Sequence, residues 1–165
     1  MVPAIVDIEA SGVGRGSYPI EVGLALPTGK THCFLIRPEP EWTRWDREAE
    51  VMHGLNRGVV EAHGRGAPEV ASRLNDILRG TTVFSDGWGF DVSWLAALFE
   101  AAGILQRFRV EPLSSLLDDE RMRLWDRVRA QVEEELGVNR HRASTDALIL
   151  QLTYVRTCGL VETTP

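Results

Sequence analysis

Three strand-like segments at the start of the chain constrain its fold more than any other feature. Residues 2–8 form an apolar run rich in Val and Ile, and residues 18–26 and 31–38 have the composition of two further strands. Glycines at positions 12, 14 and 16 mark a turn before the second segment, and the sequence PTGK at 27–30 forms a tight turn after it. Strands joined in this way are typical of an antiparallel meander.

The rest of the chain alternates helical and strand patterns. Apolar residues at helical spacing predict helices at 44–55, 67–80, 90–104, 116–137 and 141–159, and two further strands are predicted at 81–86 and 108–113. This order predicts an α/β fold with one mixed sheet covered by helices. The 165 residues are a usual size for a single domain, so we expect one domain spanning 1–165.

Composition narrows the class of protein. The chain is 44% hydrophobic and 25% charged, as in ordinary soluble proteins, and no apolar run approaches a membrane span. The N-terminus has no signal-peptide pattern, and Cys33 and Cys158 fit neither a disulfide framework nor a CxxC metal site. These features favour a cytoplasmic protein with free thiols and no membrane partner. The net charge of −6 disfavours a binder of long duplex DNA, but it is compatible with an enzyme whose acids collect divalent cations.

Two acids in the first strand region raise the question of chemistry. Asp7 and Glu9 lie two residues apart beside aliphatic residues, so they point to the same face of the strand. Carboxylates so close repel each other unless one is protonated or a cation lies between them. Oxygen-rich sites of this kind suit Mg²⁺ or Mn²⁺. The alternative is a pair of acids on a solvent-facing edge.

Further candidate residues lie on the predicted helices. Asp91 shares an apolar stripe with Trp94, and Asp146 is flanked by apolar residues in the last helix. An acid at the start of a helix can also be stabilised by the helix dipole alone. His141, five residues before Asp146, could accept a proton from water near neutral pH, or it could be structural.

The order DxE, then D, then HxxxxD resembles the DEDDh 3′–5′ exonucleases. The matching segments are IVDIEASG, MHGL, GFDVSWL and HRASTDAL, spread over nearly the whole chain. Position 142 is Arg, whereas the sister class of these enzymes has Tyr four residues before the last acid, so the His class fits. The resemblance implies a ribonuclease H-like three-layer fold, with a five-stranded mixed sheet whose first three strands are antiparallel.

The resemblance also implies roles for individual residues. Asp7, Glu9 and Asp146 would ligate one of two Mg²⁺ or Mn²⁺ ions, Asp7 and Asp91 would hold the second, and His141 would be the general base. Ala10 and Ser11 would lie near the terminal nucleotide, although the family usually has Thr-Thr there. His53 and Leu55 would line the pocket of the terminal base, or Leu55 would simply belong to the core.

Several residues keep two interpretations. Asp86 is either an additional acid beside the site or a helix cap. Trp88 and Trp94 either stack on bases or pack in the core. Arg140 and Arg142 either contact phosphate or are solvated.

The resemblance implies a metal-dependent exonuclease that releases 5′-mononucleotides from the 3′ ends of single-stranded nucleic acid. The alternatives are a catalytically silent nucleic-acid-binding or scaffold module with the same fold, and a phosphodiesterase acting on short oligonucleotides. No residue in the sequence decides between DNA and RNA.

Overall fold

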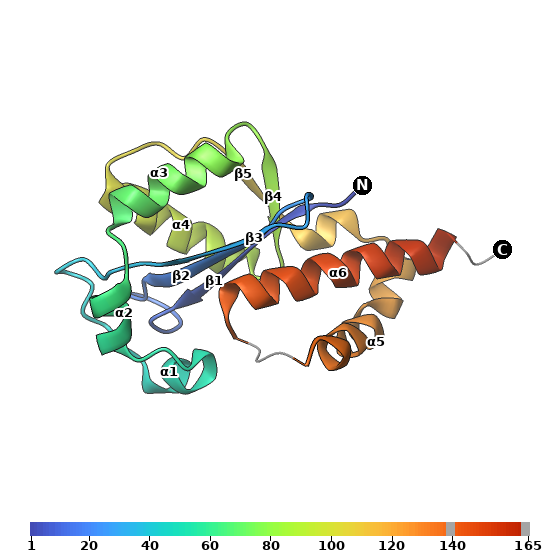
Figure 1. Cartoon of the computed structure of the whole chain (residues 1–165), viewed down its shortest axis with the longest axis horizontal. Coiled ribbons are helices and arrows are strands. Elements are labelled where there is room, and N and C mark those ends of the chain that lie inside the picture. The colour runs from blue at the N-terminus through green and yellow to red at the C-terminus, as the bar shows by residue number, and fades with distance from the viewer. Residues whose placement is uncertain (138–140, 163–165) are drawn as a thin grey trace.

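A computed structural model describes residues 1–137 and 141–162 of the protein. Its centre is a five-stranded sheet with the order β3-β2-β1-β4-β5 (Figure 1). Strands β1 and β2 pair antiparallel, as do β2 and β3, whereas β4 is parallel to both β1 and β5. The predicted mixed sheet with an antiparallel meander is therefore confirmed. The strands are β1 (Ala4–Ala10), β2 (Pro19–Ala25), β3 (Thr31–Leu35), β4 (Thr82–Ser85) and β5 (Arg109–Pro112).

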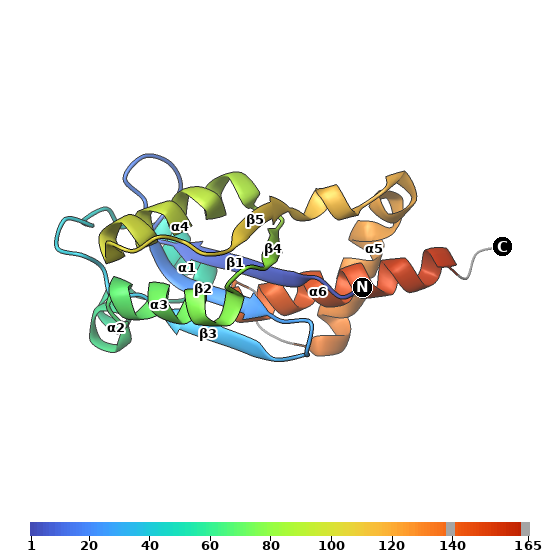
Figure 2. The same cartoon turned by 90° about the horizontal axis from the view of Figure 1, so that it is seen from above.

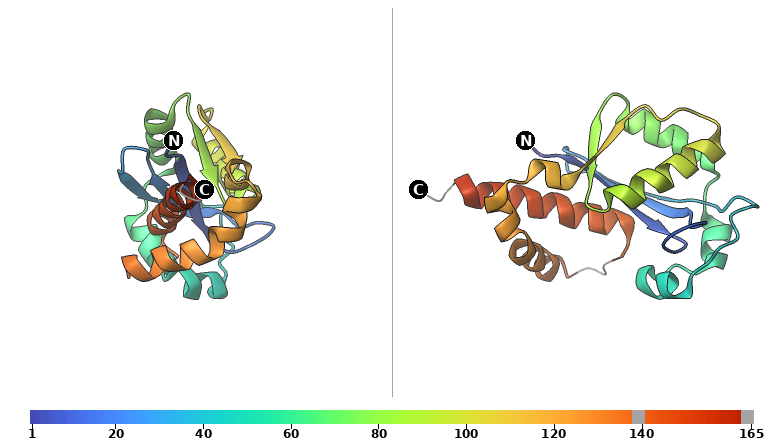
Figure 3. Two further views of the ribbon diagram at one scale, coloured as in Figure 1. Left: turned by 90° about the vertical axis from the view of Figure 1, so that its right-hand side faces the viewer. Right: turned by 180° about the vertical axis from the view of Figure 1, so that it is seen from behind.

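Helices cover both faces of the sheet and form the two outer layers of a three-layer fold (Figures 2 and 3). Helices α3 (Ala67–Leu78) and α4 (Trp88–Ala102) pack against one face, where they build the largest hydrophobic cluster. Helix α6 (Ala143–Glu162) packs against the other face, with α5 (Asp119–Leu136) beside it. The remaining helical elements are α1 (Arg47–His53), α2 (Arg57–His63) and the 3₁₀ turn η1 (Leu113–Leu116).

The alternation of side chains along β1 determines which residues face α6. Val6 and Ile8 belong to the cluster with α3 and α4, whereas Ile5 packs with Ala147 and Leu150 of α6. Because side chains on a strand alternate between its faces, Asp7 and Glu9 lie on the same face as Ile5 and point toward α6. The two acids thus lie in the interior layer between the sheet and α6.

Several element boundaries differ from the predictions. β1 extends to Ala10, so its acids lie within the strand rather than at its end. α1 ends at His53, because Gly54 adopts a left-handed conformation that closes the helix. α2 was not predicted, since its sequence RGVVEAH has Gly, a weak helix former, at its second position; the side chain of Asn56 caps its start.

The last helix also differs at both ends. It begins at Ala143 rather than His141, because His141 has a φ of 64°, which is incompatible with a right-handed helix. It continues past Gly159, since a single Gly is tolerated inside a helix whose neighbours favour it. None of the helices in the described ranges combines the length and apolar character needed to cross a membrane.

Candidate metal centre

Asp7 and Glu9 are held in a poorly solvated position between the central strand and α6. Burial raises the pKa of Asp7 well above its ordinary value, and the charges of Asp91, Glu9 and Asp146 raise it further. Burial also raises the pKa of Glu9 to about 7, with additional repulsion from Asp146 and from Glu21. A cation or an additional hydrogen-bond donor beside the two acids would therefore stabilise their charged forms.

Gly23 of β2 brings the start of α6 into close contact with these acids. It is the cross-strand neighbour of Asp7, and a Cβ atom placed on it would lie 2.0 Å from the carbonyl carbon of Ala143. No side chain fits between the strand and the helix at this point. The first turn of α6, including Asp146, is therefore packed directly against the strand that neighbours β1.

Asp146 and His141 complete one side of the centre. Ligand atoms of Glu9, His141 and Asp146 all lie within 4.8 Å of one another. The backbone N–H of His141 donates to Oδ2 of Asp146 at 3.0 Å, and His141 Nδ1 lies 4.0 Å from the same oxygen. Two carboxylates and an imidazole at this spacing can share a single divalent cation, or the imidazole can face water bound beside it.

Asp91 contributes a fourth acid from the first turn of α4. Asp91 is 2% exposed, and the hydroxyl of Ser85 at the end of β4 donates a hydrogen bond to its carboxylate. Burial raises the pKa of Asp91 to about 7, the Ser85 hydroxyl opposes the shift, and the charge of Asp86 adds to it. The charge of Asp91 also raises the pKa of both Asp7 and Glu9, which places it in the same electrostatic group.

Asp86 does not cap α4. The cap residue is Gly87, and Asp86 lies 3.4 Å from the guanidinium of Arg129 on α5. The capping interpretation from the sequence is therefore wrong. Asp86 remains an additional negative charge beside the centre, because it raises the pKa of Asp7 and Asp91.

The chemistry of this donor set fits hard divalent cations. Burial raises the pKa of three of the four carboxylates, Asp7, Glu9 and Asp91, so negative charge at the site is unfavourable without a counter-ion. Oxygen donors of this kind match the preferences of Mg²⁺ and Mn²⁺, and an imidazole is compatible with Mn²⁺. Asp7, Glu9, Asp91 and Asp146 are the residues that could hold such ions.

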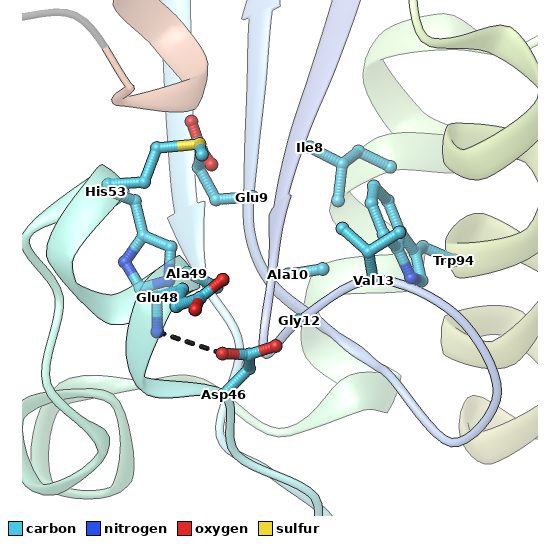
Figure 4. A pocket seen from close by; sticks show the side chains of 11 residues that line it. Ile8, Glu9, Ala10, Gly12, Val13, Asp46, Glu48, Ala49, His53 and Trp94 are labelled. Carbon is cyan, nitrogen blue, oxygen red and sulfur yellow. Dashed lines mark hydrogen bonds between the residues drawn. The ribbon is translucent and has the colours of Figure 1, made fainter.

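A pocket of about 280 Å³ adjoins Glu9 (Figure 4). Figure 4 shows Ile8, Val13 and Trp94 on one side of it, with Asp46, Glu48 and His53 on the other. Ala10 also lines the pocket. Ile8, Val13 and Trp94 thus form an apolar wall, whereas the wall at α1 combines the three polar side chains with Ala49 and Met52.

The structure places the four expected substrate contacts in different environments. Ala10 and His53 line the pocket, and burial lowers the pKa of His53 so that the neutral ring is favoured. Ser11 is fully buried and its hydroxyl accepts a hydrogen bond from the backbone N–H of Tyr18 at 3.1 Å. Leu55 packs in a core cluster with Tyr18, as the alternative interpretation had it. Neither Ser11 nor Leu55 lines this pocket.

The tryptophans and arginines that had two interpretations also differ in their surroundings. Trp94 is packed against the core, donates its indole N–H to Ser17 Oγ at 3.0 Å and lines the pocket. Trp88 is 43% exposed, with its indole N–H bonded to the carbonyl of Val110 at 2.9 Å. Arg142 is paired with Glu21, so its guanidinium is already occupied by a carboxylate, and its side chain remains 42% exposed. Arg140 lies outside the described residues.

Glu21 is a charged residue of this region that the sequence analysis missed. It is the cross-strand neighbour of Glu9 and is fully buried. The signal was present, since an acid stands between Ile20 and Val22 in an apolar strand, as costly a position as that of Asp7. Its partner is 121 residues away, however, and no spacing pattern in the sequence connects the two.

Together the sheet, the helix layers and the acidic centre define an α/β protein with the ribonuclease H-like fold. Comparison with solved structures finds exonuclease I of Methylocaldum szegediense, with a TM-score of 0.69 at 15% identity over 98% of this chain and 40% of that one. It also finds exonuclease I of E. coli in complex with a dA16 oligonucleotide, with a TM-score of 0.67 at 14% identity over 95% of this chain and 40% of that one.

A zinc-bound complex of the E. coli enzyme with single-stranded DNA is similar in the same way, with a TM-score of 0.68, 15% identity and 96% of this chain covered. The chain spans about two fifths of the length of these proteins, 40% to 42%. No protein-family model and no curated protein sequence matches it. At such low identity the likeness establishes the fold.

Proposed function

We propose that residues 1–165 form a catalytic domain of the DEDDh type that removes nucleotides from the 3′ ends of single-stranded nucleic acid. The observation that carries this proposal is the convergence of four acids and His141 between β1, α4 and α6, next to a pocket. The likeness to exonuclease I structures, some of them bound to oligonucleotides, supports a nucleic-acid substrate.

Asp7, Glu9 and Asp146 hold one divalent ion in this proposal, and Asp7 with Asp91 holds a second. When bound, two Mg²⁺ or Mn²⁺ ions would supply Lewis acidity on both sides of the scissile phosphodiester. The crowding of carboxylates whose pKa values are raised toward 7 supports this assignment, because bound cations would remove the repulsion between them.

The protein's own groups then position the substrate and move the proton. The apolar wall of the pocket receives the terminal nucleoside, with the backbone of Ala10 and the neutral ring of His53 beside it. His141 accepts a proton from the attacking water, since its ring lies next to Asp146 and Glu9. The water oxygen bonds to phosphorus while the bond from phosphorus to the 3′-oxygen of the preceding nucleotide breaks. That oxygen takes up a proton to become the new 3′-hydroxyl, and a 5′-mononucleotide leaves.

The test is a 5′-labelled single-stranded oligonucleotide, as DNA and as RNA, incubated with Mg²⁺, with Mn²⁺ and with EDTA. We expect a ladder that shortens from the 3′ side in the presence of either metal and stops with EDTA. Asp7→Asn and Asp146→Asn should each lower kcat by about 10³-fold, since loss of a metal ligand removes several kcal/mol of transition-state stabilisation. Asp76→Asn, an exposed acid on α3, is the matched control and should leave kcat unchanged.

Other outcomes would identify the alternatives. Metal-dependent binding of 3′ ends without turnover would indicate a silent binding module. Cleavage of dinucleotides but not of decanucleotides would indicate a phosphodiesterase for short substrates. Full activity of Asp7→Asn would refute the assignment of the centre.

A further inference from the structure

Glu21 is a carboxylate with no exposed surface in the middle of β2. A buried charge is tolerated only where hydrogen bonds and an opposite charge replace the lost water. Burial alone would raise the pKa of Glu21, but hydrogen bonds from Arg142, the Ala143 backbone and Cys33 outweigh it and hold the pKa below its usual value. Glu21 is therefore an anion. The positions in the fold of the residues that donate hydrogen bonds to it indicate its role.

Most of those partners come from the segment that begins α6. Arg142 donates from Nε to both carboxylate oxygens at 3.1 Å and from Nη2 to Oε1 at 2.6 Å. The backbone N–H of Ala143 donates to Oε2 at 2.9 Å, and Cys33 Sγ lies 3.2 Å from Oε1. A carboxylate held by an arginine fork and a backbone N–H is fixed in both position and orientation.

The anchored segment lies between two residues of the candidate centre. His141 immediately precedes Arg142, and Asp146 is in the first turn of α6 after Ala143. His141 adopts a left-handed backbone conformation, which is unfavourable for a residue with a side chain and persists only where its surroundings impose it. The Glu21 anchor on one side and the bond from His141 N–H to Asp146 on the other supply that constraint.

We propose that Glu21, acting through Arg142 and the Ala143 N–H, is a positioning residue that fixes the His141 ring relative to Glu9 and Asp146. The proposal rests on the function proposed above, in which His141 is the general base. Glu21 does not touch the reacting atoms in this arrangement. Its contribution is geometric, because a base displaced by about 1 Å loses much of its effect on the rate.

A purely structural role for Glu21 makes a different prediction, and the chain offers a matched control for it. Gln151 lies on the same helix, is almost fully buried, and donates to the carbonyls of Pro3 at 2.7 Å and Ala25 at 3.1 Å. Gln151 thus ties α6 to the end of β2 and to the residue before β1, at a position five residues beyond Asp146. Gln151→Met removes a comparable polar anchor without altering the segment 141–143.

The experiment measures kcat and KM on the labelled oligonucleotide, at a temperature where circular dichroism shows each variant folded. We expect Glu21→Gln to lower kcat by about 10- to 100-fold with KM changed by less than about 2-fold, since the base is misplaced while the pocket is intact. Gln151→Met should lower Tm but keep kcat within about 2-fold. In a His141→Ala background, Glu21→Gln should lower kcat by less than a further 3-fold or so, because the group it positions is already absent.

A second variant covers the case in which Glu21→Gln does not fold. The double change Glu21→Met with Arg142→Met replaces the ion pair by apolar side chains, an exchange that often preserves stability. It should show the same fall in kcat, since the Ala143 N–H loses its acceptor and the arginine fork is gone.

Three results would overturn the proposal. The first is wild-type kcat in a folded Glu21 variant, and the second is a fall in kcat that is equally large in Glu21→Gln and in Gln151→Met. The third is a fall in kcat from Glu21→Gln that is as large in the His141→Ala background as in the wild-type protein. A wild-type protein without nuclease activity would instead refute the proposed function, and the positioning role with it.

Discussion

Gly23→Ala should misplace the first turn of α6. A Cβ atom at this position would lie 2.0 Å from the carbonyl carbon and 2.3 Å from the carbonyl oxygen of Ala143, whereas ordinary contact begins at 3.4 Å. Both obstacles are backbone atoms, so no side-chain rotation relieves the clash. The helix start must therefore retreat from β2 by about 1.4 Å, the difference between 3.4 and 2.0 Å.

That displacement has consequences for activity and for stability. The 2.9 Å hydrogen bond from Ala143 N–H to Glu21 cannot span the added distance, and Asp146 moves with the same turn. Misplacement of a reacting group by this amount lowers kcat by about 10²-fold. Overpacking of a buried contact costs about 1–3 kcal/mol, equivalent to a fall in Tm of roughly 2–12 °C for a chain of this size.

The assay pairs kcat on the labelled oligonucleotide with Tm from differential scanning calorimetry. Gly159→Ala is the control on the same helix, because among the described residues a Cβ there meets no atom within 4 Å. Its Tm should stay the same or rise slightly, since Ala favours the helix more than Gly does. A Gly23→Ala protein with wild-type kcat would refute the argument that close approach of α6 to β2 is needed for the chemistry.

Three further measurements test the acids and one distant contact. In metal-free protein, burial raises the pKa values of Glu9 and Asp91 to about 7. Their protonated forms therefore stabilise the fold below about pH 4, and this contribution is lost as the pH rises through 7. Tm in EDTA should fall across that range, and Mn²⁺ should raise Tm by more at pH 8 than at pH 5.5. Ser85→Ala removes the hydroxyl that stabilises charged Asp91, so calorimetric titration should show Mn²⁺ binding weakened by about 10-fold, equivalent to one hydrogen bond to a charged group; unchanged affinity would contradict that role. Asn75→Leu breaks hydrogen bonds to the backbone of Leu105 and Arg107 and should cost about 2–4 kcal/mol in urea unfolding while leaving kcat unaltered.

The antiparallel meander of β1, β2 and β3 was predictable because its signals are local. The apolar runs and the tight turn at 27–30 define strands whose pairing needs no distant information. The short helix α2 was missed, since its sequence RGVVEAH includes a Gly that disfavours a helix and its Asn56 cap was not recognised. The start of α6 was misplaced because the left-handed conformation of His141 depends on tertiary bonds that no local propensity reveals.

Local sequence patterns likewise predicted only part of the acidic centre. Two acids spaced for one strand face indicated that Asp7 and Glu9 act together, and the pattern of the remaining acids followed from a family resemblance rather than from any physical rule. The pairing of Glu21 with Arg142 could not be read, because residues 121 positions apart meet only through the docking of α6 on β2. Leu55 and Ser11 were expected near the substrate but do not line the pocket, because a motif does not specify the direction of a side chain.

The acidic cluster draws its members from opposite ends of the chain, Asp7 and Glu9 from the first strand and Asp146 from the last helix. A fragment that stops before residue 141 contains three of the four acids, Asp7, Glu9 and Asp91, but neither His141 nor Asp146. The cluster therefore exists only when α6 is docked on the sheet, and a fragment that lacks α6 cannot assemble it.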